Sequence, residues 1–353
     1  MAYATIVVGT DGSETAAKAV EKATLLARRM GGRIVLVCAT APTGLTSARA
    51  TTLLRDAADD VKKNGIDVET LHSPGPPDDV VLGVATGRRA DLIVVGNVGM
   101  RKASRIRMGP VPERIAREAP CDVLIVFTKD EPAGGTGDAM RPYKGILVGV
   151  DGSPTAAEAA RTSFDLAMMF RTEVTLLYVA GDPLVGSIVL EQVMKQKPNA
   201  TAAVTKIVEG DPAETICAVA RDEGLQLIVV GNRGLTGARR VVTGSVPSQV
   251  AHGSPCDVLI VKTSNMTLDD LAPGGGGLVD VGGRKVAAYR AEDGTVIALS
   301  PRCQHMGCTV GWNGAEQTWD CPCHGSRYAK DGAVIQGPAA KALDPLDLDA
   351  PSS

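Results

Sequence analysis

Aromatic residues make up only 3% of this 353-residue chain, and histidine occurs only four times. No run of eighteen apolar residues is present, which excludes a helix that could span a bilayer. The formal net charge is −3, so whole-chain electrostatics give no reason to expect nucleic-acid binding. The first residues, MAYATIVVGTDGS, lack the basic region of a signal peptide and open directly into an apolar strand pattern. We therefore expect a cytoplasmic protein that binds neither nucleic acid nor membrane.

The first 262 residues contain a tandem repeat. IVVGTDGSETAAKAV, starting at Ile6, returns as ILVGVDGSPTAAEAA at Ile146. DLIVVGNVG at Asp91 returns in the same order as QLIVVGNRG at Gln226. A period of about 135–140 residues indicates two copies of a whole domain, because solenoid repeats are much shorter.

Within each copy, short runs rich in valine, isoleucine and leucine alternate with helical patterns. Runs of this kind are typical of parallel strands buried on both faces, and the low aromatic content agrees with such aliphatic sheets. In the first copy we expect strands near 5–10, 33–39, 66–71, 91–96 and 122–127, with helices near 13–30, 46–63, 77–88 and 111–118. In the second we expect strands near 145–150, 173–179, 203–208, 226–231 and 257–262. Five strands joined by right-handed helical crossovers predict a doubly wound parallel α/β sheet in each copy.

In doubly wound sheets, ligands bind beyond the carboxyl ends of the strands, where strand order reverses. A glycine-rich stretch follows the fourth strand of the second copy: Gly231 and Gly234, nine residues, then Gly244 and Ser245. Glycines let the backbone approach a phosphate, and the following helix offers its free N–H groups. No Walker lysine follows, which excludes a P-loop. Glycines between a strand and a helix also serve simply as turns, which is the alternative interpretation.

The arrangement resembles the universal stress protein family, in its ATP-binding subclass, duplicated in tandem. The resemblance implies a nucleotide site in the second copy made by Asp151 at the ribose, Val179 at the adenine, and Gly231, Gly234, Gly244 and Ser245 at the phosphates. The matching residues of the first copy are Asp11, Ala39, Gly96, Gly99 and Gly109. There Pro110 replaces the hydroxyl residue, and proline offers neither a side-chain oxygen nor a backbone N–H. We expect the second copy to bind ATP or a related adenine nucleotide, and the first to bind it weakly or not at all.

Near the end of the chain, two Cys-plus-His pairs occur in CQHMGC and CPCHGSRY. The pairs are Cys303 with His305 and Cys321 with His324. Two thiolates and two imidazoles can hold zinc tetrahedrally, or a [2Fe–2S] cluster with both imidazoles on one iron. Two further cysteines, Cys308 and Cys323, lie one in each loop, where a disulfide would clamp the loops together. These neighbours favour the cluster over zinc.

The stretch from about Gly277 to Leu348 resembles a Rieske [2Fe–2S] domain. The resemblance implies that one iron is bound by Cys303 and Cys321 and the other by His305 and His324, and that Cys308 and Cys323 form a disulfide. It also implies that Ser326 bonds a bridging sulfide and that Tyr328 bonds the sulfur of Cys303. Gly337-Pro338-Ala339 matches the proline loop that covers such clusters. A structural zinc ribbon is the alternative.

These motifs predict a domain order. We expect a first repeat over 1–130, a linker over 131–142, a second repeat over 143–263, a flexible glycine-rich linker over 264–277 and a cluster domain over 278–350. GGRK at Gly282 and EDGT at Glu292 predict hairpin turns, so the last domain should be a small antiparallel β fold. Trp312 and Trp319 should pack its core.

The combination predicts a nucleotide-binding stress-response protein that carries an electron-transfer or redox-sensing Rieske domain. The two repeats should pair as an intramolecular pseudo-dimer, an arrangement also compatible with a homo-oligomer. The alternative is a soluble Rieske component of a separate flavoprotein oxidoreductase or oxygenase system, with a flavoprotein reductase as redox partner. A stand-alone oxygenase is not expected, because its catalytic iron needs two more histidines and a carboxylate. Only His72 and His252 remain, and they lie in different repeats.

Overall fold

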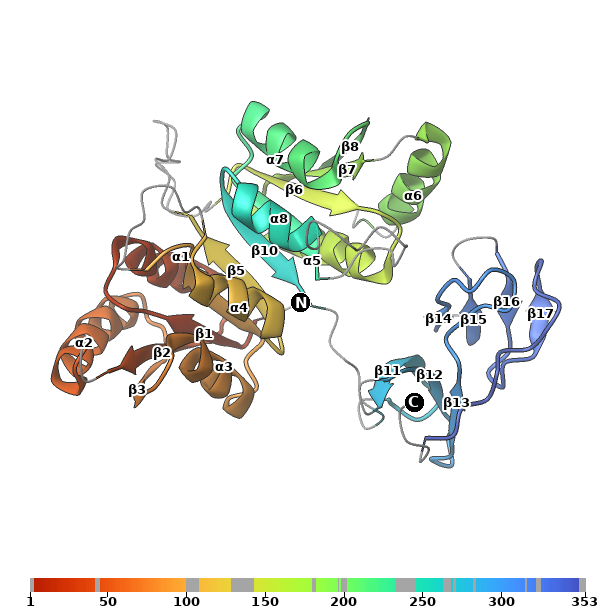
Figure 1. Ribbon diagram of the computed structural model, residues 1–353, viewed down its shortest axis with the longest axis horizontal. Coiled ribbons are helices and arrows are strands. Elements are labelled where there is room, and N and C mark those ends of the chain that lie inside the picture. The colour runs from red at the N-terminus through yellow and green to blue at the C-terminus, as the bar shows by residue number, and fades with distance from the viewer. Residues whose placement is uncertain are drawn as a thin grey trace. The chain divides into compact units, whose positions relative to one another are not determined.

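The computed structural model describes residues 3–41, 45–99, 108–127, 143–179, 182–195, 197, 202–232, 246–262, 268, 271–281, 284–314, 316–321 and 325–348. The chain divides into two compact units, Met1–Thr263 and Ser264–Ser353. The first unit contains both repeats, and the second contains the predicted cluster domain (Figure 1).

The first repeat alternates strands and helices as its apolar pattern predicts. Its elements are β1 (Thr5–Gly9), α1 (Glu14–Met30), β2 (Arg33–Thr40), α2 (Ser47–Lys63), β3 (Val68–Pro74), α3 (Pro77–Gly87), β4 (Leu92–Gly96), α4 (Pro110–Glu118) and β5 (Asp122–Val126). The strands are parallel, in the order β3-β2-β1-β4-β5. Strand order therefore reverses between β1 and β4, whose carboxyl ends mark the expected ligand position.

The second repeat has the same topology. Its elements are β6 (Gly145–Val150), α5 (Pro154–Phe170), β7 (Glu173–Val179), α6 (Pro183–Lys195), β8 (Ala203–Val208), α7 (Pro212–Asp222), β9 (Leu227–Gly231), α8 (Val246–Gly253) and β10 (Asp257–Val261). The doubly wound α/β fold is confirmed in both repeats. The predicted boundaries agree closely with the observed ones, and the largest difference is β3, which runs on to Pro74.

Each repeat starts its first helix with the same capped turn. The Ser13 hydroxyl accepts the backbone N–H of Ala16 at 3.3 Å, and the Ser153 hydroxyl accepts that of Ala156 at 3.2 Å. The preceding glycines, Gly12 and Gly152, both have φ of 81°, which only glycine adopts readily. The local sequence therefore determines where α1 and α5 begin. None of the described helices is long and apolar enough to cross a membrane.

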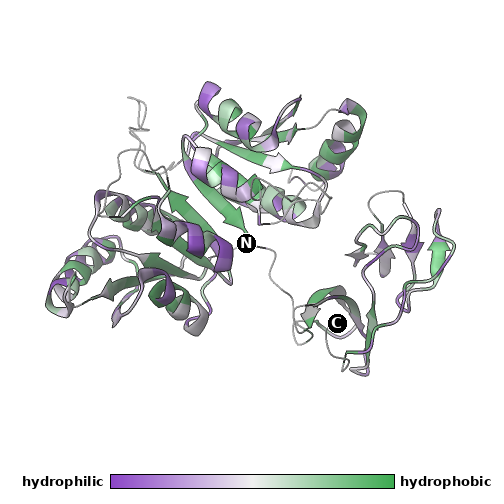
Figure 2. Cartoon of the chain, viewed as in Figure 1, coloured by the Kyte–Doolittle hydropathy of each residue, from purple (hydrophilic) through white to green (hydrophobic). Residues whose placement is uncertain are grey.

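The two repeats join edge to edge. Strands β5 and β10 pair antiparallel, with Leu124 directly opposite Leu259, so that the described strands of both repeats form one ten-stranded sheet. In Figure 1, β5 and β10 lie side by side between the two sets of helices. Figure 2 shows the strands as mostly hydrophobic, whereas helices such as α1, α2 and α4 mix hydrophobic and hydrophilic residues. Two buried aliphatic clusters, one on each face, extend across this seam.

A buried carboxylate ties the repeats together at each end of the seam. Asp122 accepts a hydrogen bond from the Tyr3 hydroxyl at 2.7 Å, within the first repeat. It also accepts the backbone N–H of Lys262, from the second repeat, at 2.7 Å. Burial raises the pKa of Asp122 to about 6, although both hydrogen bonds work to lower it. The seam thus contains a carboxyl group that is costly to ionise.

Asp257 occupies the equivalent place in the second repeat. It accepts the Tyr143 hydroxyl at 3.0 Å and the backbone N–H of Phe127, from the first repeat, at 2.9 Å. The ammonium of Lys22 lies 3.7 Å from this carboxylate and 4.5 Å from the centre of the Tyr143 ring. Burial raises the pKa of Asp257, and Lys22 acts against that shift. The exchange of backbone contacts between the repeats is symmetric, and Lys22 adds an ion pair at Asp257.

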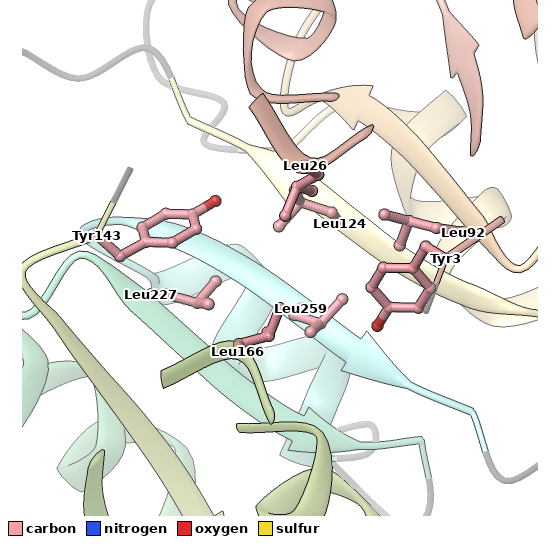
Figure 3. Close-up of a pocket in the computed structure, with 8 residues that line it drawn as sticks. All are labelled: Tyr3, Leu26, Leu92, Leu124, Tyr143, Leu166, Leu227 and Leu259. Atoms are coloured by element: carbon pink, nitrogen blue, oxygen red, sulfur yellow. The ribbon is translucent and has the colours of Figure 1, made fainter. Parts of the chain in front are cut away.

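A small apolar cavity lies at the centre of the seam (Figure 3). It is lined by the same four positions of each repeat: Tyr3, Leu26, Leu92 and Leu124, and Tyr143, Leu166, Leu227 and Leu259. Equivalent surfaces therefore face one another, as they do across a two-fold axis of a dimer. The repeats pack as the expected intramolecular pseudo-dimer.

The second unit is a small all-β fold, as predicted. Its strands are β11 (Gly276–Val281), β12 (Arg284–Arg290), β13 (Val296–Leu299), β14 (Gly311–Asn313), β15 (Thr318–Asp320), β16 (Arg327–Tyr328) and β17 (Val334–Gln336). They form two antiparallel sheets, β11-β12-β13 and β14-β15-β16-β17. Trp319 is fully buried and Trp312 packs against it, with ring centres 4.9 Å apart. Both tryptophans contribute to the core as expected.

The glycine-rich stretch differs from its prediction at one end. Gly276 and Gly277 are not part of a flexible linker, because they begin β11 and pair with Tyr289 and Ala288. A Cβ atom on Gly276 would lie 2.5 Å from the Trp312 ring, so a glycine is needed for the ring to approach the strand. The predicted linker therefore ends before Gly276.

Candidate metal and nucleotide sites

The first predicted ligand loop is a tight turn after Cys303. The backbone N–H of Cys303 donates to the carbonyl of Cys308 at 2.8 Å, and that of Gly307 donates to the carbonyl of Cys303 at 2.8 Å. Gly307 has φ of 74°, which closes the turn. Cys303 is buried, and His305 is exposed on the turn. The loop therefore presents a sheltered thiol and an accessible imidazole.

The second ligand loop connects β15 to β16. The backbone N–H of Cys321 donates to the carbonyl of Ser326 at 2.7 Å, and Gly325 donates back to Cys321 at 3.1 Å. Cys321 is buried like Cys303. Two other predicted site residues, Cys323 and His324, lie outside the described residues. Within the described part of the chain, no three Cys, His, Asp or Glu side chains gather around one point.

The Tyr328 side chain lies at the first thiol. The Tyr328 hydroxyl lies 3.0 Å from the sulfur of Cys303 and accepts the backbone N–H of Gln304 at 3.1 Å. Burial works to raise the pKa of the Cys303 thiol, but hydrogen bonds with Tyr328, the His305 backbone, Ser326 and Cys321 outweigh it and lower that pKa. Burial and the bond to Cys303 raise the pKa of Tyr328 to about 12, so its proton stays on oxygen. These hydrogen bonds favour the thiolate form of Cys303, the form that binds iron.

The predicted proline loop packs on the second ligand loop. The backbone N–H of Ala339 donates to the Ser326 hydroxyl at 3.2 Å. Gly337 has φ of 104°, and a Cβ atom there would lie 2.5 Å from the Cα of Ser326. Contacts this close shelter Ser326, which is fully buried. The described donor set of two facing thiols and two hydroxyls fits a [2Fe–2S] cluster.

The predicted disulfide remains a prediction. Cys308 is half-buried against the core of the domain and is a free cysteine among the described residues. Its expected partner, Cys323, lies outside them. The contact between the Gln304 backbone and Tyr328 was missed by sequence reasoning, because a backbone donor has no signature in side-chain identity.

In the first repeat, the structure brings the five predicted nucleotide residues to the carboxyl edge of the sheet. Asp11 follows β1 and accepts the Ser13 backbone N–H at 2.9 Å. A Cβ atom on Gly99 would lie 2.8 Å from the Asp11 carboxylate, so the loop after β4 approaches the loop after β1. Gly109 closes the β4 loop by donating to the carbonyl of Asn97 at 2.7 Å. The remaining two, Ala39 and Gly96, lie near the ends of β2 and β4.

The described half of the second site repeats this geometry. Asp151 accepts the Ser153 backbone N–H at 2.9 Å, and Val179 ends β7. A Cβ atom on Gly231 would lie 2.7 Å from Thr155, the same contact that Gly96 makes with Thr15. The phosphate-side residues Gly234, Gly244 and Ser245 lie outside the described residues, so their placement remains a prediction.

Pro110 begins helix α4 of the first repeat. Gly109 is the N-cap and makes no side-chain capping bond. Proline is favourable at this position because its missing N–H would have no partner inside the helix. The same feature removes one donor from the helix end where a phosphate would bind.

Comparison with known proteins supports both halves of this picture. The universal stress protein family model matches residues 2–126 and 142–262. The chain belongs to the universal stress protein family. A Rieske [2Fe-2S] domain model matches residues 262–347, so this universal stress protein carries a C-terminal Rieske domain.

Relatives match the two halves separately. Universal stress protein Rv1636 of Mycobacterium tuberculosis is 34% identical over 145 residues, which cover 36% of this chain and 98% of the relative. The crystal structure of a universal stress protein from Archaeoglobus fulgidus aligns with a TM-score of 0.59 and 20% identity over 74% of this chain and 99% of that one, which supports the fold. The Bacillus subtilis protein YhfW, named for a Rieske 2Fe-2S centre, is 46% identical over 89 residues. That match covers 25% of this chain and only 18% of YhfW.

Proposed function

We propose that this universal stress protein binds an adenine nucleotide in its second repeat and transfers single electrons through a Rieske [2Fe–2S] centre. The observation that carries the redox half is the Tyr328 hydroxyl at 3.0 Å from the buried sulfur of Cys303. A structural zinc site needs no such donor, whereas hydrogen bonds to the sulfurs adjust the reduction potential of an iron–sulfur cluster. The universal stress protein repeats support a cytoplasmic location.

Some residues of the chain would bind the cluster, and others would adjust its reduction potential. When bound, the cluster accepts and releases one electron, and imidazole ligation raises its reduction potential. Cys303 and Cys321 would hold one iron, and His305 and His324 the other. Tyr328, itself held by the Gln304 N–H, donates toward the Cys303 sulfur and so favours the extra negative charge of the reduced state.

Purified protein tests the redox half. Iron and acid-labile sulfide should be present in equal amounts, with the absorption and electron paramagnetic resonance spectra of a Rieske centre. Cys303→Ser or Cys321→Ser should lose the cluster. Tyr328→Phe combined with Ser326→Ala should keep it but lower its potential, because two donors to sulfur are gone. Colourless protein with stoichiometric zinc and no iron would refute this half of the proposal.

The nucleotide half rests on the duplicated site. Both repeats hold an aspartate at the strand-order reversal by the same turn, and Gly231 and Gly96 make the same close contact behind it. The second repeat keeps glycine and serine at 244 and 245, where the first has Pro110 as its second residue. Backbone N–H groups and a serine hydroxyl are the donors that phosphate needs, so the second repeat is the better site.

Calorimetric titration tests this asymmetry. We expect one site for ATP in the unmodified chain, and cyclic AMP serves as a second probe with one phosphate. Ser245→Pro should remove most of the binding, whereas Pro110→Ser should add affinity in the first repeat. Two equal sites in the unmodified chain would contradict the asymmetry.

A sensing role requires the nucleotide and the cluster to be linked. If ATP shifts the reduction potential, reduction must shift the affinity for ATP by the same free energy. For a one-electron couple, about 59 mV corresponds to a tenfold change in affinity, so weak linkage is measurable. Redox titrations with and without saturating ATP decide the question. Superimposable curves would mean that the two modules act independently.

A further inference from the structure

The second ligand loop is flanked by a charged pair on the far side of its strands. Asp320 ends β15 and Arg327 begins β16, and the two residues are directly paired in the sheet. Side chains alternate between the two faces of a strand. Their neighbours Cys321, Ser326 and Tyr328 are buried on the cluster face, so the charged pair lies on the opposite face.

The contact between the pair uses two nitrogens on one edge of the guanidinium. Arg327 Nε lies 3.1 Å from one oxygen of Asp320, and Nη2 lies 3.3 Å from the other. The carboxylate also accepts Asn313 at 2.9 Å and Thr318 at 2.8 Å, and Arg327 makes a second ion pair with Glu316. A planar fork bound at two points restricts orientation as well as distance. Both side chains are about one-third exposed, and pairs this exposed contribute little to overall stability.

The pairing of β16 with β17 is irregular between Arg327 and Tyr328, so β17 does not fix the direction of the Tyr328 side chain. The pairing of β16 with β17 shifts register between Arg327, opposite Gln336, and Tyr328, opposite Val334. The extra residue, Ile335, lies in β17, so β17 does not pair residue for residue with β16 at this point.

The regular pairing of β16 is with β15, where Asp320 lies opposite Arg327 and holds it. The direction in which the neighbours of Arg327, Ser326 and Tyr328, point therefore depends on that contact.

We propose that Arg327 is a positioning residue whose two-point contact with Asp320 aims the hydroxyls of Tyr328 and Ser326 at the cluster and so sets its reduction potential. This inference rests on the proposed Rieske centre. Arg327 touches none of the predicted ligands in the described contacts; it acts through the strand that carries the two donors.

Arg327→Lys tests the geometry at constant charge, because an ammonium cannot reproduce the planar fork. The variant should retain iron and show a lower potential than wild type. Lys330→Arg is the matched control: Lys330 lies 5.2 Å over the Tyr289 ring, away from the pair, and its exchange should leave the potential unchanged. A wild-type potential in Arg327→Lys would overturn the proposal.

Asp320→Asn supplies a second test in which charge and geometry act in opposite directions. Removal of a negative charge near the cluster favours the reduced state and raises the potential. Loss of the two-point contact leaves the hydroxyls less well directed at the cluster, which lowers the reduction potential. We expect the potential to fall. A rise would mean that only charge matters and would refute the positioning role.

A double-mutant cycle shows whether Arg327 acts through the hydroxyls. In a Ser326→Ala, Tyr328→Phe background, Arg327→Lys should no longer change the potential. An equal shift in both backgrounds would refute the proposal. If the wild-type protein holds no iron–sulfur cluster, the proposed redox function fails as well. If it holds one and the variants match it, only the positioning role fails.

Discussion

Asp122→Asn should stabilise the tandem repeats at neutral pH relative to wild type, and the gain should disappear on acidification. Asp122 is buried at the seam and accepts the Tyr3 hydroxyl and the Lys262 backbone N–H. The two donors reach different oxygens of Asp122. Asparagine keeps one oxygen for the Lys262 backbone N–H, turns its amide NH2 toward the Tyr3 hydroxyl, which can accept, and carries no charge. The substitution therefore removes the cost of burying the charge while it retains the contact between the repeats.

The magnitude follows from the pKa of Asp122, which burial raises from 3.8 to about 6. Because the folded state prefers the protonated carboxyl, the stability from this group is complete below pH 3.8 and is lost as the pH rises through about 6. At about 1.36 kcal/mol per pKa unit, the loss is about 3 kcal/mol. The free energy of unfolding of the asparagine variant, minus that of wild type, should grow by about this amount between pH 4 and pH 7. Other carboxylates titrate equally in both proteins and cancel in the difference.

Urea denaturation followed by the helical signal in circular dichroism measures this difference. The described helices all lie in the Met1–Thr263 unit, so the signal reports on the repeats. Tyr3→Phe is the companion variant: it removes a hydrogen bond that lowers the pKa of Asp122, so the loss of stability should extend to higher pH. The reasoning would be refuted if the free energy of unfolding of Asp122→Asn, minus that of wild type, were the same at pH 4 and at pH 7.

Three further substitutions test the packing. Leu124→Ala should enlarge the seam cavity and lower the free energy of unfolding by about 2–5 kcal/mol. Urea denaturation measures the loss. A much smaller loss would mean that the surrounding side chains move in to fill the gap. Gly276→Ala should destabilise the Rieske domain by about 1–3 kcal/mol because its Cβ would strike the Trp312 ring. Tryptophan fluorescence measures this change, and Gly311→Ala, with open space around its Cβ, is the control that should unfold like wild type. Ser153→Ala removes the cap of α5 and should cost about 1 kcal/mol in the same urea assay, an expectation contradicted by an unchanged midpoint.

Much of the architecture could be predicted because its determinants are local. Aliphatic runs and the capped Asp-Gly-Ser turns locate the strands and the starts of α1 and α5, since both signals depend on residues within one or two helical turns. The cluster residues are also close in sequence. Cys303 and Tyr328 face each other across short loops and paired strands, and this contact was an expectation from the resemblance to a Rieske domain.

Contacts between distant segments could not be predicted in the same way. DVLIV occurs in both β5 and β10, and nothing in that run says that the two strands pair with each other and join the repeats into one sheet. In the sequence, Asp122 and Asp257 look like ordinary polar residues at the start of a strand, and only the seam gives each a backbone donor from the other repeat. Gly276 suggests a flexible linker until the Trp312 ring packs against it. In each case the physical cause is burial against a surface distant in sequence, which becomes defined only when the chain has folded.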